Sequence, residues 1–249
     1  MDHGRTPFLS SLLKREDYRV HSWYSGVPST TPSVQGELFY GKRTAVPAFG
    51  FRDHETGRLT SMFNIGTATQ VEQRLAASAP GLLEGGSSYA NVYAGGADRT
   101  AFCFTKTGIG RLLNGLSVLK LLLLAVLHVA ALGRVAVLLV IETLLAFTDF
   151  IRGVAGRHHF FKELKFIPSR VGVCILLREM VTASVLADVA LGVPVIHANF
   201  LGYDEQSHRR GPSSTFAHWT LKGIDWSLRR IWNAAHRSSR RDYDVWIYS

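Results

Sequence analysis

The clearest indication of fold class lies near the C-terminal end of the chain, in Gly192-Val193-Pro194-Val195-Ile196-His197-Ala198-Asn199-Phe200. This segment is entered through a Gly-Val-Pro turn, and its apolar pattern suits a strand buried on both faces. Such strands are typical of parallel sheets whose faces are covered by helices. We therefore predict a core strand here, in a largely parallel α/β sheet.

The rest of the chain alternates between helix and strand patterns. Helices are expected at 7–13, 71–77, 171–190 and 216–235, and strands at 18–24, 91–94 and 243–248. The segment Gly85-Gly86-Ser87-Ser88 has the composition of a loop. This alternation predicts an open, largely parallel sheet flanked by helices.

Composition narrows the class of protein. The chain has 249 residues, of which 47% are hydrophobic and 19% charged, which excludes collagen-like and low-complexity classes. Two cysteines, Cys103 and Cys174, are too few for a disulfide framework. The net charge of +9 favours anionic partners such as phosphorylated substrates, lipid headgroups or nucleic acid.

The middle of the chain is apolar. Residues 112–150 are dominated by Leu, Val and Ala, and neither half is a clean membrane span, because a span needs roughly 20 apolar residues with few charges. Gly133-Arg134 fits the turn of a helical hairpin, and Arg111 and Arg152 flank it, as expected near anionic headgroups. A helical pair buried against the sheet or a partner subunit is the alternative.

We therefore predict three parts. Residues 1–108 form the N-terminal part of an α/β core, 109–157 form an apolar helical insertion associated with a membrane, and 158–249 form the C-terminal part of the core.

Chemistry is predicted in the segment that follows the core strand. Asp204 and His208 stand four residues apart, so they can share one face of a helical turn or lie together in a tight loop, and Gly211-Pro212 follows them. Carboxylate and imidazole are both good ligands for zinc, and ligands of open α/β sheets bind beyond the carboxyl ends of strands. On spacing alone, a surface turn with an ion pair explains these residues equally well.

Taken whole, this segment resembles the Asp-x-x-x-His-x-x-Gly-Pro metal-binding signature of the alkaline phosphatase superfamily. It is most similar to the nucleotide pyrophosphatase/type I phosphodiesterase branch, and within it to bacterial membrane-linked members. The resemblance extends to residues 216–225 and back to Pro28-Ser29-Thr30-Thr31-Pro32, which looks like the family's nucleophile turn. In that family the nucleophile stands two residues before a proline, which selects Thr30, with Thr31 as the fallback.

The resemblance implies a phosphohydrolase or phosphodiesterase with two divalent metal ions, taken to be Zn²⁺. Thr30 would be the nucleophile and a metal ligand, and Asp204 and His208 would bind metal. Arg209 and Arg210 would contact the phosphate-ester substrate, since guanidinium groups fit phosphate oxygens, although exposed arginines are the commoner outcome. Membrane lipid is an expected partner, with the bacterial inner membrane as the location, and nucleic acid is not expected because no recognisable module is present.

The chain also departs from the family pattern. The family has a metal-binding aspartate before a helix that resembles residues 4–9, and it continues into Asp-His-Gly after a strand that resembles residues 245–249. Neither piece is in this sequence. We therefore expect an incomplete fragment of the core that neither assembles the two-metal centre nor turns over substrate alone. The alternative is a non-catalytic, membrane-associated interaction protein on the same scaffold, and the sequence assigns no role to Asn91 or Asn199.

Overall fold

The computed structural model describes residues 4–43, 46–106 and 172–249, together with positions 133, 136, 137, 139–141, 143, 144, 146–148, 150, 151 and 160. The chain divides into two compact units. Unit 1 comprises Met1–Ser11, Gly108–Ala183 and Phe200–Arg230, and unit 2 comprises Leu12–Thr107, Ser184–Asn199 and Ile231–Ser249. Each unit is described by itself.

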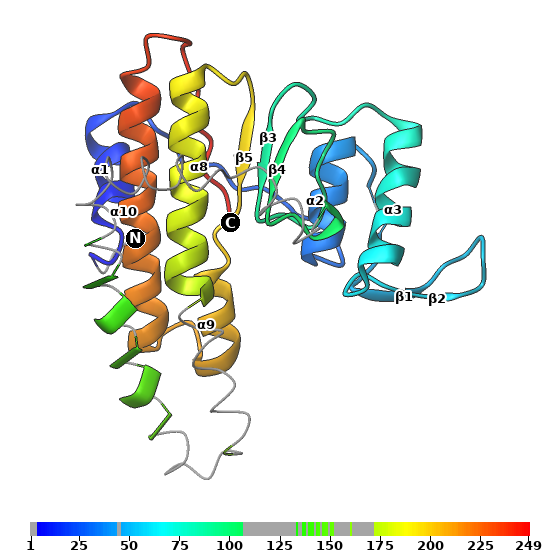
Figure 1. Ribbon diagram of the computed structural model, residues 1–249, viewed down its shortest axis with the longest axis horizontal. Coiled ribbons are helices and arrows are strands. Elements are labelled where there is room, and N and C mark those ends of the chain that lie inside the picture. Colours follow the sequence, from blue (N-terminus) through cyan, green and yellow to red (C-terminus); the bar gives the residue numbers. More distant parts are fainter. Residues whose placement is uncertain are drawn as a thin grey trace, which may run out of the picture. The chain divides into compact units, whose positions relative to one another are not determined.

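A three-stranded parallel sheet lies in unit 2. Its order is β4 (Arg99–Ala101), β3 (Ser87–Tyr89) and β5 (Ile196–Ala198), with Ser87 opposite both Arg99 and Ile196. A strand is confirmed within the predicted segment as β5, and helices flank the sheet (Figure 1). However, β5 lies at the edge of the sheet and its three residues are only half-buried, so the expectation of a core strand buried on both faces is wrong. The chain is thus a mixed α/β protein with a parallel sheet.

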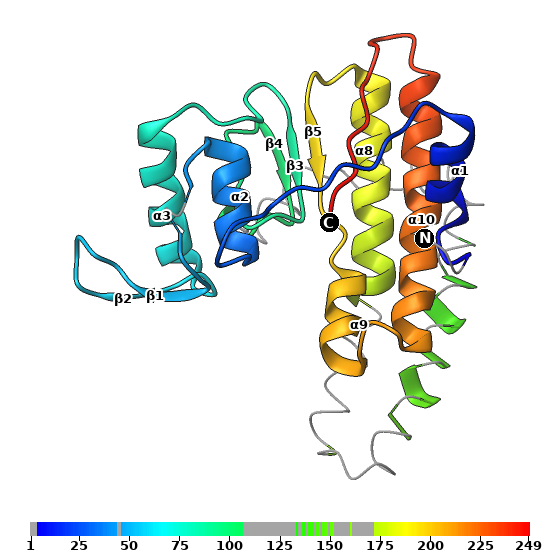
Figure 2. The same cartoon turned by 180° about the vertical axis from the view of Figure 1, so that it is seen from behind.

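Two helices and a hairpin complete the hydrophobic core of unit 2. These are α2 (Thr31–Tyr40), α3 (Ile65–Ser78) and the antiparallel pair β1 (Gly50–Arg52) and β2 (Leu59–Ser61), followed after β4 by the short helix η1 (Phe104–Lys106). Figures 1 and 2 show α2 beside α3. The buried core cluster comprises Phe39, Tyr40, Val46, Met62, Ala68, Val71, Leu75, Leu83 and Tyr93.

The remaining elements are helices. In three of them, one part of the helix belongs to unit 1 and the other part to unit 2. The remaining helices are α1 (Pro7–Arg15), a π-helical segment η2 (Gly172–Leu177) that leads into α8 (Arg178–Leu191), α9 (Gly202–Arg210) and α10 (Thr215–His236). In unit 1, Asp225 of α10 accepts hydrogen bonds from the N–H groups of Phe8 and Leu9 at 3.0 and 2.9 Å. A carboxylate that accepts from the N–H groups at the start of a helix stabilises its first turn, because these groups have no carbonyl partner within the helix.

Three strand predictions are wrong. The strand expected at 91–94 is absent, and the pairing occurs at Ser87–Tyr89, where a loop was expected. Residues 18–24 and 241–249 contain no strand, although side chains tie the last segment to the residues before β5: Tyr243 donates to the carbonyl of Val193 at 2.8 Å. An extended segment becomes a strand only where a neighbouring backbone pairs with it.

The apolar insertion expected at 109–157 lies mostly outside the described residues. Its described positions between 133 and 151 are helical, and the hairpin itself stays a prediction. Among the helices in the described part of the chain, none is long and apolar enough to cross a membrane.

Candidate functional site

Thr30 stands at the N-terminus of α2 with an unused hydroxyl. Its backbone is extended (φ −85°, ψ 148°), and its carbonyl accepts the first hydrogen bond of the helix, from the N–H of Val34 at 3.0 Å. A threonine here ordinarily caps the helix through its side chain, but Thr30 does not. Its Oγ1 is buried and has no hydrogen-bond partner among the described residues. A buried polar atom without a hydrogen-bond partner lowers the stability of the fold unless another group, such as a ligand, binds it.

Buried amide side chains join α2 to the sheet. Gln35 Nε2 donates to Asn91 Oδ1 at 3.1 Å, and Gln35 Oε1 accepts from the N–H of Val92 at 2.8 Å. Asn91 Nδ2 in turn donates to Ser88 Oγ, inside β3, at 2.9 Å. Because Gln35 lies one turn beyond Thr31, this network holds the first turns of α2 at the carboxyl end of β3.

Unusual backbone geometry marks the same edge of the sheet. Ala90 and Phe102 directly follow β3 and β4, and both have positive φ angles, 57° and 59°. For residues with a side chain, this conformation costs roughly 1–2 kcal/mol. Strained residues cluster at functional sites, and ligands of open α/β sheets bind at the carboxyl ends of strands.

Asp204 and His208 lie together on α9 in unit 1. His208 Nε2 is 3.3 Å from Asp204 Oδ1, and the two side chains are 81% and 71% exposed. The predicted shared helical face is therefore present. The pair offers one oxygen and one nitrogen donor, which suits zinc. In the described part of the chain, no group of three or more His, Cys, Asp and Glu side chains could hold a metal ion.

The other predicted site residues are placed only in part. Arg209 and Arg210 belong to α9, but their side chains lie outside the described part of the structure. Thr30 belongs to unit 2, whereas Asp204 and His208 belong to unit 1. Their proximity stays a prediction. Asn199, after β5, donates its N–H to the carbonyl of Tyr89 at 3.0 Å and so extends the pairing of β5 with β3.

Sequence reasoning missed a buried acidic group that organises the sheet. Asp188, on α8, is 3% exposed and accepts hydrogen bonds from Arg99 Nη1 at 2.9 Å and from the hydroxyls of Ser87 and Tyr89. Burial and this carboxylate raise the pKa of the Tyr89 phenol above its usual range. The available signal is a single charge within the apolar stretch 185–190.

A histidine lies on β5, at the edge of the sheet. His197 packs edge-on against Phe39 with ring centroids 4.8 Å apart, and its Nε2 is hydrogen-bonded to the hydroxyl of Tyr248. Its Nδ1 is buried without a partner among the described residues. Burial lowers the pKa of His197 to about 4, because a protonated imidazole is poorly solvated there.

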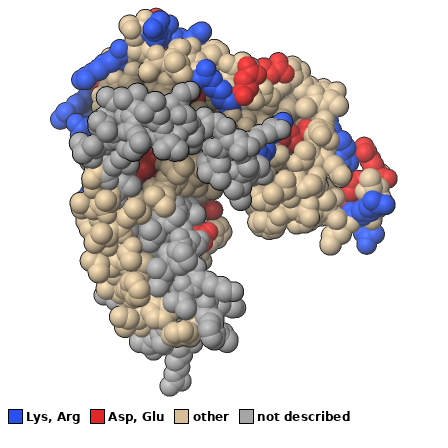
Figure 3. All heavy atoms as spheres, viewed as in Figure 1, with Lys and Arg blue, Asp and Glu red and all other residues tan. Residues whose placement is uncertain are grey.

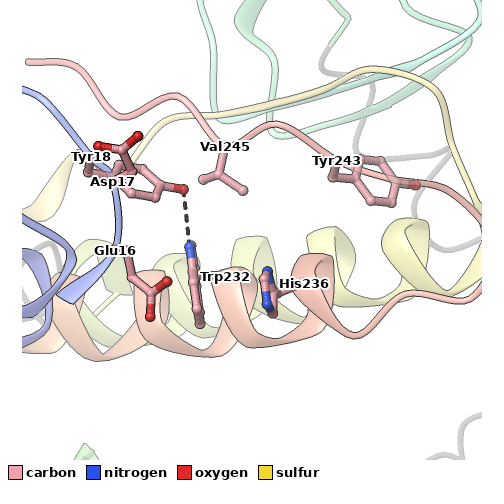
Figure 4. A pocket seen from close by; sticks show the side chains of 7 residues that line it. All are labelled: Glu16, Asp17, Tyr18, Trp232, His236, Tyr243 and Val245. Atoms are coloured by element: carbon pink, nitrogen blue, oxygen red, sulfur yellow. Dashed lines mark hydrogen bonds between the residues drawn. The ribbon is translucent and has the colours of Figure 1, made fainter.

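A small open cavity of about 190 Å³ is lined by none of the predicted site residues. Its lining comprises Glu16, Asp17, Tyr18, Trp232, His236, Tyr243 and Val245 (Figure 4). Trp232 stacks on His236 with ring centroids 4.8 Å apart and donates to the Tyr18 hydroxyl at 3.1 Å.

The fold and the site together define a mixed α/β protein with an exposed acid–imidazole pair and with a threonine at a helix N-terminus whose hydroxyl has no partner among the described residues. Comparison with known proteins finds no matching family model, curated protein or solved structure.

Proposed function

We propose that this chain carries the nucleophile and one metal-binding pair of a metal-dependent phosphohydrolase or phosphodiesterase. The observation that carries the proposal is the Thr30 hydroxyl, which is buried, has no hydrogen-bond partner among the described residues and is located at the N-terminus of a ten-residue helix. Unpaired N–H groups and the helix dipole favour a phosphate group at this position. The resemblance to the alkaline phosphatase superfamily supplies the reaction type.

Thr30 acts as the attacking group in this proposal. Its Oγ1 forms a bond to phosphorus while the bond from phosphorus to the leaving-group oxygen breaks, so the phosphoryl group moves to the protein. The hydroxyl proton of Thr30 ends on the leaving-group oxygen, and the leaving group departs as an alcohol. A water molecule then attacks the phosphothreonine and releases phosphate or a phosphate monoester. A threonine hydroxyl is a weak nucleophile at neutral pH, and the positive end of α2 stabilises the negative charge that develops on its oxygen.

Asp204 and His208 would hold a divalent ion, with Zn²⁺ as the first choice for an oxygen and nitrogen donor set. When bound, that ion would supply Lewis-acid stabilisation of negative charge on the phosphate ester. Further ligands are required, because catalytic zinc sites use three protein ligands. In this proposal Arg209 and Arg210, which follow His208 on α9, contact the phosphate oxygens.

We further propose that the protein works at a membrane and takes a phosphate-ester substrate there. The apolar composition of residues 112–150 and the net charge of +9 support this location. The second candidate function is a non-catalytic, membrane-associated interaction protein. The observation that favours it is the strong exposure of Asp204 and His208, with no third donor beside them among the described residues.

Two neighbouring threonine variants test the catalytic proposal. The gene product that contains this sequence is supplied with Zn²⁺ and assayed on 4-nitrophenyl phosphate and bis(4-nitrophenyl) phosphate. Thr30→Ala should lower the hydrolysis rate by a factor on the order of a thousand or more, whereas Thr31→Ala should retain most activity. Acid-quenched protein should contain phosphate on the peptide that includes Thr30. Activity that survives Thr30→Ala overturns the proposed nucleophile, and wild-type protein without activity favours the interaction protein.

A further inference from the structure

One side of α10 in unit 1 carries a row of exposed aromatic and basic side chains. After Thr215, the exposed positions up to Arg230 are Trp219, Lys222, Trp226 and Arg229. Their spacing of three, four and three residues places them on one face of the helix. We refer to these four residues as the tryptophan–basic row.

Other positions of the same helix are packed inside the unit. Its buried positions include Phe216, Ala217, Thr220, Asp225 and Ser227. In contrast, Trp219 and Trp226 are 38% and 37% exposed. Packing of the buried positions therefore leaves both indole rings at the surface of the unit.

The chemistry of the row fits a bilayer headgroup region. Indole rings favour the membrane–water interface because they combine an apolar body with a polar N–H group. Lys222 and Arg229 alternate with them, and the guanidinium of Arg230 lies 4.7 Å from the centre of the Trp226 ring. Long basic side chains keep their charge at the level of lipid phosphates while their stems cover apolar surface.

Basic charge continues beyond the end of the helix. Three exposed arginines follow it: Arg237, Arg240 and Arg241. Figure 3 shows Lys and Arg side chains gathered around this end of α10. These arginines belong to unit 2 and give that unit basic charge of its own, which is complementary to an anionic surface.

A second feature of unit 1 points independently to lipid. Apolar side chains are exposed at helical spacing at the described positions Val137, Val140, Ile141, Leu144, Phe147 and Ile151. Single exposed apolar residues are ordinary, but a contiguous row marks a protein or membrane interaction surface. Nucleic acid would engage the cations of α10, but aliphatic side chains offer its bases no stacking platform. An anionic bilayer engages both features.

We propose that the tryptophan–basic row of α10 lies in the headgroup region of an anionic lipid bilayer. This inference rests on the membrane association proposed above and is independent of phosphoryl transfer. It assigns the contact to particular side chains, so it can fail while the protein still binds membranes through another segment.

Quenching of tryptophan fluorescence by brominated lipid tests the assignment. The chain is mixed with vesicles of phosphatidylcholine and phosphatidylserine, with or without bromine on the acyl chains. The double variant Trp219→Phe/Trp226→Phe should lose most of the bromine-dependent quenching. The matched control, Trp23→Phe/Trp246→Phe, removes two other exposed indoles and should retain it. Circular dichroism verifies that both variants fold.

The basic side chains are tested by binding to the same vesicles. Lys222→Gln/Arg229→Gln should weaken binding roughly thirtyfold, whereas Lys42→Gln/Arg58→Gln, two exposed cations of unit 2, should change it little. The proposal is overturned by any of four results: no vesicle binding, quenching unaffected by Trp219→Phe/Trp226→Phe, equal binding to vesicles without phosphatidylserine, or tighter binding to single-stranded RNA than to anionic vesicles.

Discussion

His208 Nε2 lies 3.3 Å from Asp204 Oδ1 across one turn of α9, with both side chains directed to the surface. An exposed pair of this kind stabilises a helix by only about 0.3–0.5 kcal/mol, so fold stability does not require these two residues. Two donors that stand together without a structural task are available to a ligand. The following predictions separate that role from a surface ion pair.

Zinc affinity should depend on both members of the pair. Binding of Zn²⁺ to the chain is measured by isothermal titration calorimetry. Asp204→Asn and His208→Gln should each weaken binding at least tenfold. Loss of a group that only supports a metal ligand lowers metal affinity roughly 10–100-fold, and loss of the ligand itself should cost at least as much. Glu205→Gln, which removes the next carboxylate of the same turn, is the matched control and should bind like the wild type. Equal zinc affinity in all four proteins would leave the pair as a surface ion pair.

The amide network beneath α2 should contribute measurably to stability. Gln35→Ala and Asn91→Ala each leave a buried polar partner unsatisfied, so each should lower the free energy of unfolding by about 1–3 kcal/mol in urea titration. The double variant should lower the free energy of unfolding by less than the sum of the two single effects, because the two side chains are hydrogen-bonded to each other. Gln73→Ala on the exposed side of α3 serves as the control. Strict additivity would show that the two residues do not act together.

The burial of His197 predicts a pH dependence of stability. Its pKa is about 4 in the folded chain, whereas an unfolded histidine titrates near 6.5. Between these values the unfolded state binds the extra proton, so stability should fall as pH decreases, by about 1 kcal/mol per pH unit. Urea titrations at several pH values should show a smaller slope in His197→Gln and an unchanged slope in His54→Gln, which lies on the surface. A wild-type slope in His197→Gln would rule out this assignment.

Periodicity alone identified the long elements. The amphipathic patterns around α1 and α10 were sufficient, because each helix buries one face. The apolar segment around β5 located a strand, but not its half-buried position at the edge of the sheet. The shared face of Asp204 and His208 followed from helical geometry in the same way.

Strand β3 could not be predicted by these means. Ser87 and Ser88 have the composition of a loop. In the structure, however, the Ser87 hydroxyl donates a hydrogen bond to Asp188, 101 residues away in the sequence. Ser88 is satisfied by Asn91 and by the carbonyl of Tyr93. Polar residues can be buried in a strand only when hydrogen-bond partners, here from distant parts of the sequence, satisfy them. The local sequence pattern around a strand does not indicate where these partners are. Thr30 was selected by resemblance to a family. That its hydroxyl lacks a partner among the described residues could not be predicted from the sequence, because it depends on how α2 packs.

The central proposal is that Thr30 and the Asp204–His208 pair serve one metal-dependent phosphoryl-transfer centre in the gene product that contains this sequence. Replacing Thr30 by cysteine places a soft ligand at that position, and a thiolate bound to Co²⁺ gives an intense near-ultraviolet charge-transfer absorption. Cys103 and Cys174 are buried, so the wild-type chain should give no such band. We predict that Thr30→Cys with Co²⁺ shows the band, that Thr31→Cys does not, and that adding His208→Gln abolishes it. A Thr30→Cys protein without the band, or with a band unaffected by His208→Gln, would contradict the account.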